Sequence, residues 1–462
     1  MSTSADDFIE NRIFDEIAVG DSARSSHTLT RDDIWLFATV SGDANPTHFD
    51  DSFHRIVGHG MWGGALISAV IGTKLPGPGS IYVEQDLHFL NPIMLGDTVT
   101  ITVTVREKRQ SDRKVILDCR AINQDGGGVI EGRATVIAPA EKIRLARVEQ
   151  PEIRVGRHER YHALMARCKG KPPVATAIIH PCDPLTLGAA VEAAAAGLIA
   201  PILVGPEAKI RAAAAAASLD ISAFPLENTP HSHAAAQRSV ELVRQAKAQM
   251  LMKGSLSTDE MMEAVMAPDS GLKTARLVSH VYLFDVPGYP RPLLITDAGL
   301  NIAPTLMDKR DIIQNAIDLA RMLGIARPKV AILSATETVN PKLVSTLDAA
   351  ALCKMADRGQ ITDGLVEGPL AFDNAISPQA ARDKGIVSPV AGYADILLAP
   401  DLEAGNMLAK QLLFMAGADA AGVVLGARVP IVYTSRADGE RTRMASCAVA
   451  AEMARARPYV AA

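Results

Sequence analysis

The stretch TVTITVTV at residues 98–105 alternates between threonine and a β-branched apolar residue at every position. A period of two is typical of a strand with one face in a core and the other in solvent. Two further strand-like runs follow, KVILDCRAI at 114–122 and VIEGRATVIA at 129–138, and the polar turn NQDGG separates them. The sequence therefore predicts an antiparallel meander.

The segment before the meander predicts a helix that the sheet buries. GMWGGALISAVIGTKL at 60–75 is apolar on nearly every side, as expected of a helix enclosed by other elements. The small residues Gly63, Gly64 and Ala65 would allow a close approach of helix and sheet. We therefore expect an antiparallel sheet folded around one buried helix.

The character of the chain changes after residue 138. The segment at 138–157 is polar and charged and has no clean period, which indicates a linker. From residue 174 onward, continuous apolar runs alternate with alanine-rich helical segments. Such strands are typical of a parallel sheet covered on both faces, so an α/β domain is predicted. We expect one domain at 8–138, a linker at 139–157 and a second domain at 158–462.

Composition excludes several classes of protein. A hydrophobic content of 48% and a mean hydropathy of +0.12 are typical of a folded chain with buried cores. The net charge of -5 and the absence of a Lys/Arg run disfavour a nucleic-acid partner. An acidic N-terminus, no long apolar segment and five cysteines without a CxxC pair lead us to expect a cytoplasmic protein with no membrane partner.

SGDANPTHFD at 41–50 places a carboxylate, Asp43, and an imidazole, His48, on either side of Asn45-Pro46. The proline disfavours a helical conformation at Asn45, so a loop is predicted after a helix at 31–42. A loop can turn both side chains toward one point, where they would exchange protons with a substrate. The alternative is an ordinary turn that Asp43 caps.

The surrounding order of features resembles that of the MaoC-like (R)-specific enoyl-CoA hydratases, which have an α+β hot-dog fold. It consists of a helix, the D-x-N-P-x-H element, GHGM at 58–61 at the start of the apolar helix, and the strand-rich segment at 79–103. The resemblance covers about residues 8–138. It implies that Asp43 and His48 form a catalytic dyad, which holds a water against the double bond of a trans-2-enoyl thioester.

The same resemblance assigns roles on the apolar helix. Negative charge builds on the thioester oxygen during hydration, so an N–H donor is needed. Gly60 is the predicted donor, because unsatisfied N–H groups lie at a helix start. Ser68 is implied to line the same pocket, and His59 lies near its entrance with either a structural or a functional role.

Five separate blocks in the second half resemble those of the phosphate acetyl/butyryltransferase family, over about residues 155–460. The implied fold has two α/β subdomains, is related to the isocitrate and isopropylmalate dehydrogenases, and has its active site in the cleft between the subdomains. The blocks are LMKGSLST at 251–258, ITDAGLNIAP at 295–304, TDGLVEGPLAFDNAIS at 362–377, LAPDLEAGNMLAKQL at 398–412 and PIVYTSRADGERTRMAS at 430–446.

The last block contains Ser435 and Arg436 directly after a predicted strand, where ligands of α/β sheets collect. A guanidinium suits bidentate phosphate binding, so Arg436 is predicted to hold phosphate, while Ser435 bonds near the thiol or the carbonyl. The thiol of CoA also needs a base. The seventh position after the serine, where the acetyltransferases suggest an Asp, is Thr442, which leaves Asp438 or Glu440 as substitutes.

The other blocks supply further predicted substrate-binding residues, each of which could instead cap a helix or hold a turn. No tight ligand cluster supports a metal site, and we expect no permanently bound cofactor. The predicted substrates are CoA thioesters and inorganic phosphate. The residues are Lys253, Asp297, Asn301, Asp363, Glu367, Asp373 and Asn406.

The sequence thus predicts a bifunctional enzyme that hydrates enoyl-CoA and transfers acyl groups between CoA and phosphate. Three alternatives stay open: a hot-dog half that only binds acyl-CoA, a metal-dependent dehydrogenase in the second half, and a transferase weakened by Thr442. Because hot-dog domains usually pack against a second copy, a homo-oligomer is also expected, at least a dimer.

Overall fold

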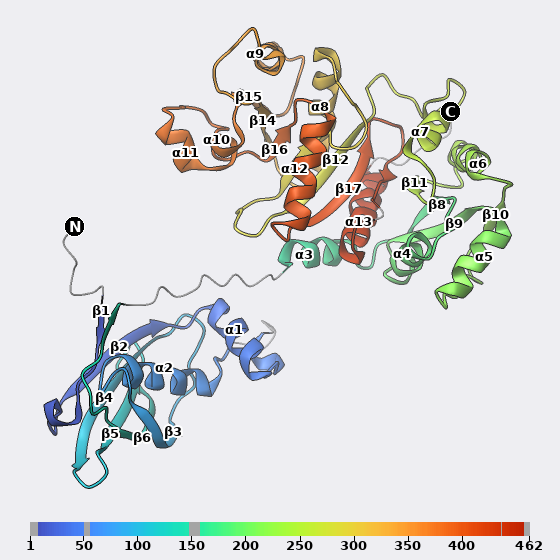
Figure 1. Ribbon diagram of the computed structural model, residues 1–462. Helices are drawn as coiled ribbons and strands as arrows, with labels where there is room; N and C mark the ends of the chain where they lie inside the picture. Colours follow the sequence, from blue (N-terminus) through green and yellow to red (C-terminus); the bar gives the residue numbers. More distant parts are fainter. Residues whose placement is uncertain (1–7, 50–55, 147–157, 436, 457–462) are drawn as a thin grey trace. The chain divides into compact units, whose positions relative to one another are not determined.

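The computed structural model describes residues 8–49, 56–146, 158–435 and 437–456. The chain divides into two compact units, Met1–Val155 and Gly156–Ala462, which are described one at a time (Figure 1).

The first unit is built on an antiparallel sheet of five strands in the order β2-β4-β5-β6-β3. The predicted meander is confirmed, since β4 pairs with β5 and β5 with β6, with Val103 opposite Cys119. The valines and Ile101 of β4 are buried, while its threonines are only half-buried, as the period of two predicts. The strands are β2 (Ser22–Thr28), β3 (Ile81–Phe89), β4 (Thr98–Arg109), β5 (Lys114–Ile122) and β6 (Gly128–Ile137).

The apolar helix α2 (Gly60–Thr73) packs on this sheet through one face only. Its residues Trp62, Ile67, Val70 and Ile71 join the core that the strands form. The opposite face is exposed, whereas the sequence predicted burial on nearly every side. Within one chain, therefore, half of an apolar helix remains uncovered.

The remaining elements of the first unit are short. Helix α1 precedes a single 3-10 turn, η3, and strand β7 pairs with β1 inside the range predicted as a linker. Their bounds are β1 (Phe8–Glu10), η2 (Phe14–Glu16), α1 (Arg31–Ser41), η3 (Pro46–His48) and β7 (Arg144–Ala146).

The second unit contains a sheet of eleven strands in the order β10-β9-β8-β11-β18-β17-β12-β13-β16-β14-β15. The strands on either side of β17 and β12 run parallel to their neighbours, as predicted, but β12 and β17 pair antiparallel with each other and with β13 and β18. The sheet thus consists of two parallel blocks that two antiparallel strands join. The strands are β8 (Val174–Ile179), β9 (Ile199–Gly205), β10 (Leu226–Asn228), β11 (Met250–Lys253), β12 (Ser279–Asp285), β13 (Leu293–Thr296), β14 (Lys329–Leu333), β15 (Leu365–Leu370), β16 (Ile396–Leu398), β17 (Asp419–Leu425) and β18 (Ile431–Val432).

Helices cover both faces of this sheet (Figure 1). The most deeply buried is α13, whose alanines let it lie close to β17, and Ala448, Val449 and Ala450 are fully buried. The helices are α3 (Glu159–Cys168), α4 (Pro184–Ala195), α5 (Glu207–Ala216), α6 (Ser232–Arg244), α7 (Thr258–Met266), α8 (Leu306–Met322), α9 (Val344–Asp357), α10 (Phe372–Ile376), α11 (Pro378–Asp383), α12 (Leu402–Phe414) and α13 (Glu440–Ala456).

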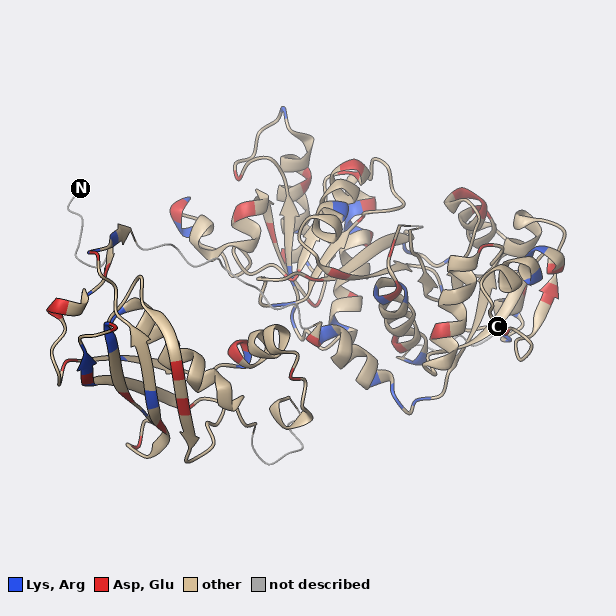
Figure 2. Cartoon of the chain, turned by 60° about the horizontal axis from the view of Figure 1, so that its bottom comes forward, with Lys and Arg blue, Asp and Glu red and all other residues tan. Residues whose placement is uncertain are grey.

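Charged residues of both signs are interspersed along both units, as the near balance of acidic and basic residues predicts (Figure 2). None of the described helices is both long and apolar enough to span a membrane.

Candidate active sites

The loop after α1 brings Asp43 and His48 together by local turn chemistry. Gly42 ends the helix with a φ of 77°, a left-handed conformation that glycine adopts without steric cost. The carboxylate of Asp43 then accepts from the backbone N–H of Asn45 at 3.2 Å, and the Asn45 side chain accepts from Thr47 N–H at 3.2 Å. Each bond folds the chain back on itself, so the acid and the base end on the same side of the turn.

The dyad is oriented for a water molecule rather than for a direct bond. His48 Nδ1 lies 2.6 Å from the carbonyl oxygen of Val57, which can only accept, so Nδ1 carries the proton. In the neutral ring the lone pair is then on Nε2, which lies 3.8 Å from Asp43 Oδ2. Two acceptors at this separation cannot bond to each other, but one water can donate a proton to each.

His59 contacts both residues of the dyad. It is buried, its ring stacks on that of His48 with centroids 3.9 Å apart, and its Nε2 donates to the backbone oxygen of Asp43 at 3.0 Å. Ligand atoms of Asp43, His48 and His59 lie within 4.8 Å of one another, the spacing of a metal site. Because lone pairs lie in the ring plane, however, two stacked imidazoles do not aim at a common ion, and the arrangement suits water positioning better than metal binding.

Gly60 and Ser68 lie on the exposed side of α2. Gly60 is the first residue of the helix, and the preceding His59 makes no side-chain cap bond, so N–H groups of the first turn are available as donors. Ser68 lies two turns further along. Both predicted residues are thus exposed, and Gly60 lies beside the Phe89 ring of the edge strand β3.

In the second unit, a cleft of about 720 Å³ brings together three predicted residues: Lys253 at the end of β11, Asn406 on α12 and Ser435 after β18. Tyr282, Tyr433, Lys410 and the loop after β13 complete its walls. A second, smaller recess of about 30 Å³ adjoins it, because Lys253 and Ser435 line both. The cleft has room for an extended ligand, and the recess for a small group.

The small recess is strongly polar. It is lined by two cations, Lys253 and Arg443, by one carboxylate, Asp183, which caps α4, and by hydroxyl groups including that of Ser255. Arg443 is buried and its guanidinium donates to the backbone oxygen of Leu185 at 3.4 Å, which fixes its position. Two cations outweigh the single carboxylate, and together with the hydroxyl donors they suit a small oxyanion such as phosphate.

Beneath Ser435 lies a buried carboxylate, Asp438. Its Oδ2 accepts from the backbone N–H of Ser435 at 2.7 Å, and its Oδ1 lies 3.6 Å from Lys410 Nζ. That Oδ1 and that Nζ have no hydrogen-bond partner among the described residues. Of the two carboxylates considered as the thiol base, Asp438 is therefore beside Ser435, whereas Glu440 is exposed at the start of α13.

A neutral histidine lies close to this pair. Burial lowers the pKa of His280 to about 4, and the charge of Lys410 acts in the same direction against that of Asp297. Its ring contacts those of Tyr282 and Tyr433, with centroids 4.6 and 4.8 Å away. Two tyrosine rings that line the cleft, one buried and one half-buried, thus pack on a fully buried histidine near the Lys410–Asp438 pair.

The other predicted residues of the second unit lie outside the cleft lining. The carboxylate of Asp297 accepts four hydrogen bonds, from the N–H groups of Gly299, Leu300 and His280 and from Asn301 Nδ2, so it holds the turn after β13. Asp363 pairs with Arg321, Asp373 pairs with Lys384, and Glu367 accepts from the N–H of Gly368. Arg436 lies outside the described residues, and the roles of all these residues stay predictions.

Sequence reasoning did not select Lys410 and Arg443 as site residues. Both occur within these sequence blocks, but a cation on a helix is most often solvated. Only the packing of α12 and α13 against distant strands buries Arg443 and the ammonium nitrogen of Lys410. A charged residue on an otherwise alanine-rich, buried helix such as α13 was the signal available.

Comparison with known proteins identifies both halves. Residues 230–451 match the family described as phosphate acetyl/butaryl transferase, and residues 17–123 match the MaoC like domain. The phosphate acetyltransferase of Rhizobium meliloti is 61% identical over 292 residues, which are 63% of this chain and 92% of the relative. The chain belongs to the phosphate acetyl/butyryltransferase family. It also carries a MaoC-like domain, so the resemblance predicted from the sequence is confirmed in both halves.

A solved structure supports the assignment of the second half. A branched-chain phosphotransacylase from Enterococcus faecalis is 29% identical, with a TM-score of 0.54, and the match covers 60% of this chain and 98% of that one. An R-hydratase from Pseudomonas aeruginosa is 39% identical, covers 32% of this chain and 99% of that one, and has a TM-score of 0.32. The transacylase domain thus shares the fold of a phosphotransacylase. The two compact units and the two separate family matches confirm the two-part architecture predicted from the sequence.

Proposed function

We propose that the transacylase domain transfers an acyl group between CoA and phosphate. The observation that carries this proposal is the pair of adjoining compartments with Ser435 and Lys253 at their junction. A small cationic recess suits phosphate, and a wide cleft suits the long arm of CoA. The thioester carbonyl then lies at the junction, where the two substrates meet.

The chemistry follows from this placement. A phosphate oxygen bonds to the carbonyl carbon, the C–S bond breaks, and CoA leaves as a thiolate that takes up the proton released by the phosphate. Lys253 and Arg443 would neutralise the phosphate, and Ser435 would donate to the oxygen of the tetrahedral intermediate. Arg436 is the further predicted phosphate ligand, on sequence grounds alone.

Asp438 would act through its neighbours. Its side chain is 1% exposed and does not line the cleft, so it contacts no substrate in this arrangement. It holds the Ser435 backbone and places the charge of Lys410 at the cleft floor. We therefore regard it as a positioning residue.

For the MaoC-like domain we propose (R)-specific hydration of trans-2-enoyl-CoA. The lone pair of His48 Nε2 and the carboxylate of Asp43, 3.8 Å apart, support this proposal. The water oxygen bonds to C3, and a water proton passes to the dyad. The dyad then donates a proton to C2, so its protonation state is the same before and after the reaction. Gly60 N–H would stabilise the charge on the thioester oxygen.

We also propose that a second copy of the chain covers the hydratase site. Strand β3 is an edge of the sheet, and its Ile81, Val83 and Phe89 are exposed, as is Met61 on α2. Exposed apolar residues on an edge strand favour association. They adjoin the uncovered helix face that carries Gly60 and Ser68, so association would also enclose the substrate.

Two assays on the full chain test the proposed function. We expect phosphate-dependent release of CoA from acetyl-CoA or butyryl-CoA with no nicotinamide present, and loss of enoyl absorbance from crotonyl-CoA. Phosphorolysis without hydration would favour the alternative that the MaoC-like domain only binds acyl-CoA. A nicotinamide requirement would favour the alternative that the second half is a metal-dependent dehydrogenase.

A further inference from the structure

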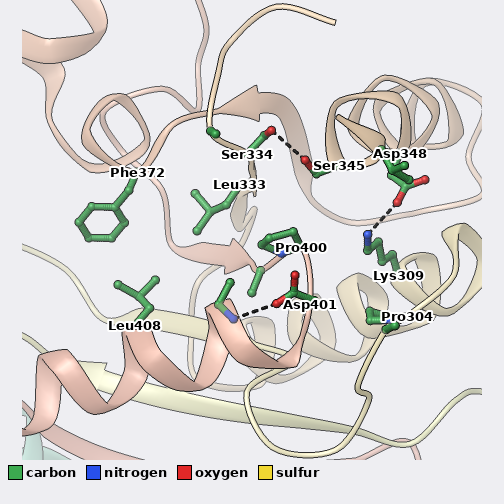
Figure 3. A pocket seen from close by; sticks show the side chains of 15 residues that line it. Pro304, Lys309, Leu333, Ser334, Ser345, Asp348, Phe372, Pro400, Asp401 and Leu408 are labelled. Atoms are coloured by element: carbon green, nitrogen blue, oxygen red, sulfur yellow. Dashed lines mark hydrogen bonds and ion pairs between the residues drawn. The ribbon is translucent and has the colours of Figure 1, made fainter. Parts of the chain in front are cut away.

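A cavity of about 620 Å³ lies on the other side of α12 from the cleft (Figure 3). Asn406 and Lys410, one turn apart, line the cleft, whereas Ala404 and Leu408, also one turn apart, line this cavity. Residues four apart share a helix face, so the helix separates two ligand-sized spaces. The volume falls in the range of about 300–1,000 Å³ typical of small-molecule sites.

The cavity lies where the sheet topology favours ligand binding. Strands β16 and β14 are parallel neighbours, and the chain leaves them toward opposite faces of the sheet. Helix α9, after β14, joins the core on one face with β14 residue Ile332, and helix α12, after β16, joins the core on the other face with Leu397. Open sheets bind ligands in the crevice beyond the carboxyl ends of such strands. Ser334 and Ala399, the residues that directly follow the two strands, both line the cavity.

The polar lining is fixed by internal bonds. Lys309 Nζ lies 2.7 Å from Asp348 Oδ2, and the Lys309 side chain is almost fully buried. The hydroxyls of Ser334 and Ser345 are 2.9 Å apart. The carboxylate of Asp401 accepts from the N–H of Ala404 at 2.9 Å with one oxygen. One lysine and two carboxylates give the lining a net negative charge, which disfavours phosphates and suits groups that donate hydrogen bonds.

Three large apolar side chains lie on the opposite wall, whereas Pro304 lies beside Lys309. Figure 3 shows Phe372, Leu333 and Leu408 on one side of the cavity and the Lys309–Asp348 pair on the other. The Phe372 ring is partly exposed, so a flat ring can pack on it. A flat apolar face and a set of donors on one molecule are therefore what this cavity matches.

We propose that this cavity binds a nucleoside. The base packs against Phe372 and Leu408, and the ribose hydroxyls donate to the carboxylates of Asp348 and Asp401. The serine hydroxyls, which both donate and accept, meet the polar edge of the base. The site is separate from the acyl-transfer cleft and does not depend on the proposed function.

Calorimetric titration of the full chain with adenosine, guanosine, cytidine and uridine tests this proposal. We expect saturable binding of at least one nucleoside that saturating CoA does not displace. Ser345→Phe, which fills the cavity, should abolish binding, and Leu347→Phe, on an exposed position of the same helix, should not. Asp401→Asn keeps the helix cap but removes the charge, and should weaken binding about tenfold.

Three results would overturn the proposal. The first is a folded chain that binds none of the four nucleosides. The second is unchanged binding by Ser345→Phe. The third is displacement by CoA, which would place the nucleoside in the acyl-transfer cleft and make the binding a part of CoA recognition.

Discussion

The backbone N–H of Ser435 donates to the carboxylate of Asp438 at 2.7 Å, so a buried acid holds the residue at the junction of cleft and recess. The other oxygen of the same carboxylate faces Lys410 at 3.6 Å. A single side chain therefore fixes the loop after β18 and the charge at the cleft floor.

Loss of that charge should impair acyl transfer without removing substrate contacts. In Asp438→Asn the Ser435 N–H keeps an acceptor, but buried Lys410 loses its counter-charge. We expect kcat for phosphorolysis to fall by about 10-fold to 100-fold, because small misplacements near reacting atoms are costly. Glu440→Gln, on an exposed residue nearby, is the matched control. A wild-type rate in Asp438→Asn would show that the charge of Asp438 does not contribute to acyl transfer.

Phosphate affinity should depend on the buried arginine of the recess. Arg443→Met removes a cation that lines the recess, whereas Arg441→Met removes an exposed one that pairs with Asp419. We expect KM for phosphate to rise about tenfold or more in the first variant and to stay unchanged in the second. Steady-state kinetics with phosphate as the varied substrate measure both. Equal effects of the two substitutions would show that the recess is not the phosphate site.

The stability of the transacylase domain should fall in acid because of His280. Its pKa of about 4 is below the ordinary value of 6.5, so between these values the unfolded chain takes up a proton that the folded chain does not. Stability is therefore lost as the pH drops through this window. His280→Phe should reduce the difference in urea midpoint between about pH 7 and about pH 5. A difference as large as in the wild type would show that other groups cause the acid sensitivity.

Association should depend on the exposed edge strand of the MaoC-like domain. Val83→Asp places a charge on β3, and Val19→Asp places one at another exposed apolar position of the same domain. We expect light scattering to give a smaller assembly for the first variant only. If hydration also needs the second copy, the same variant loses hydration and keeps phosphorolysis. An unchanged mass would exclude this strand from the interface.

The features of the fold that could be predicted from the sequence are those that residues close together in the chain determine. The alternation at 98–105 predicted the first strand of the meander. The Asn45-Pro46 turn explains why Asp43 and His48 lie near each other. These features depend on residues close in sequence, where turn and strand preferences act directly.

What the sequence could not reveal depends on distant contacts. Continuous apolar strands carry no sign of direction, so β12 and β17 were not recognised as antiparallel. The apolar pattern of α2 does not tell whether its own sheet or another surface covers each face. Burial of Arg443 and of the Lys410 ammonium nitrogen arises from packing between segments far apart in the chain, and therefore no local motif predicts it.

The central claim is that one chain carries two independent active sites, and a crossed pair of substitutions tests it most directly. His48→Gln and Ser435→Ala are made in the full chain, and each variant is assayed for hydration of crotonyl-CoA and for phosphorolysis of acetyl-CoA and butyryl-CoA. We predict that His48→Gln lowers hydration by about 100-fold or more and leaves phosphorolysis intact, and that Ser435→Ala does the reverse. Loss of both activities from either substitution, or of neither, would contradict the account.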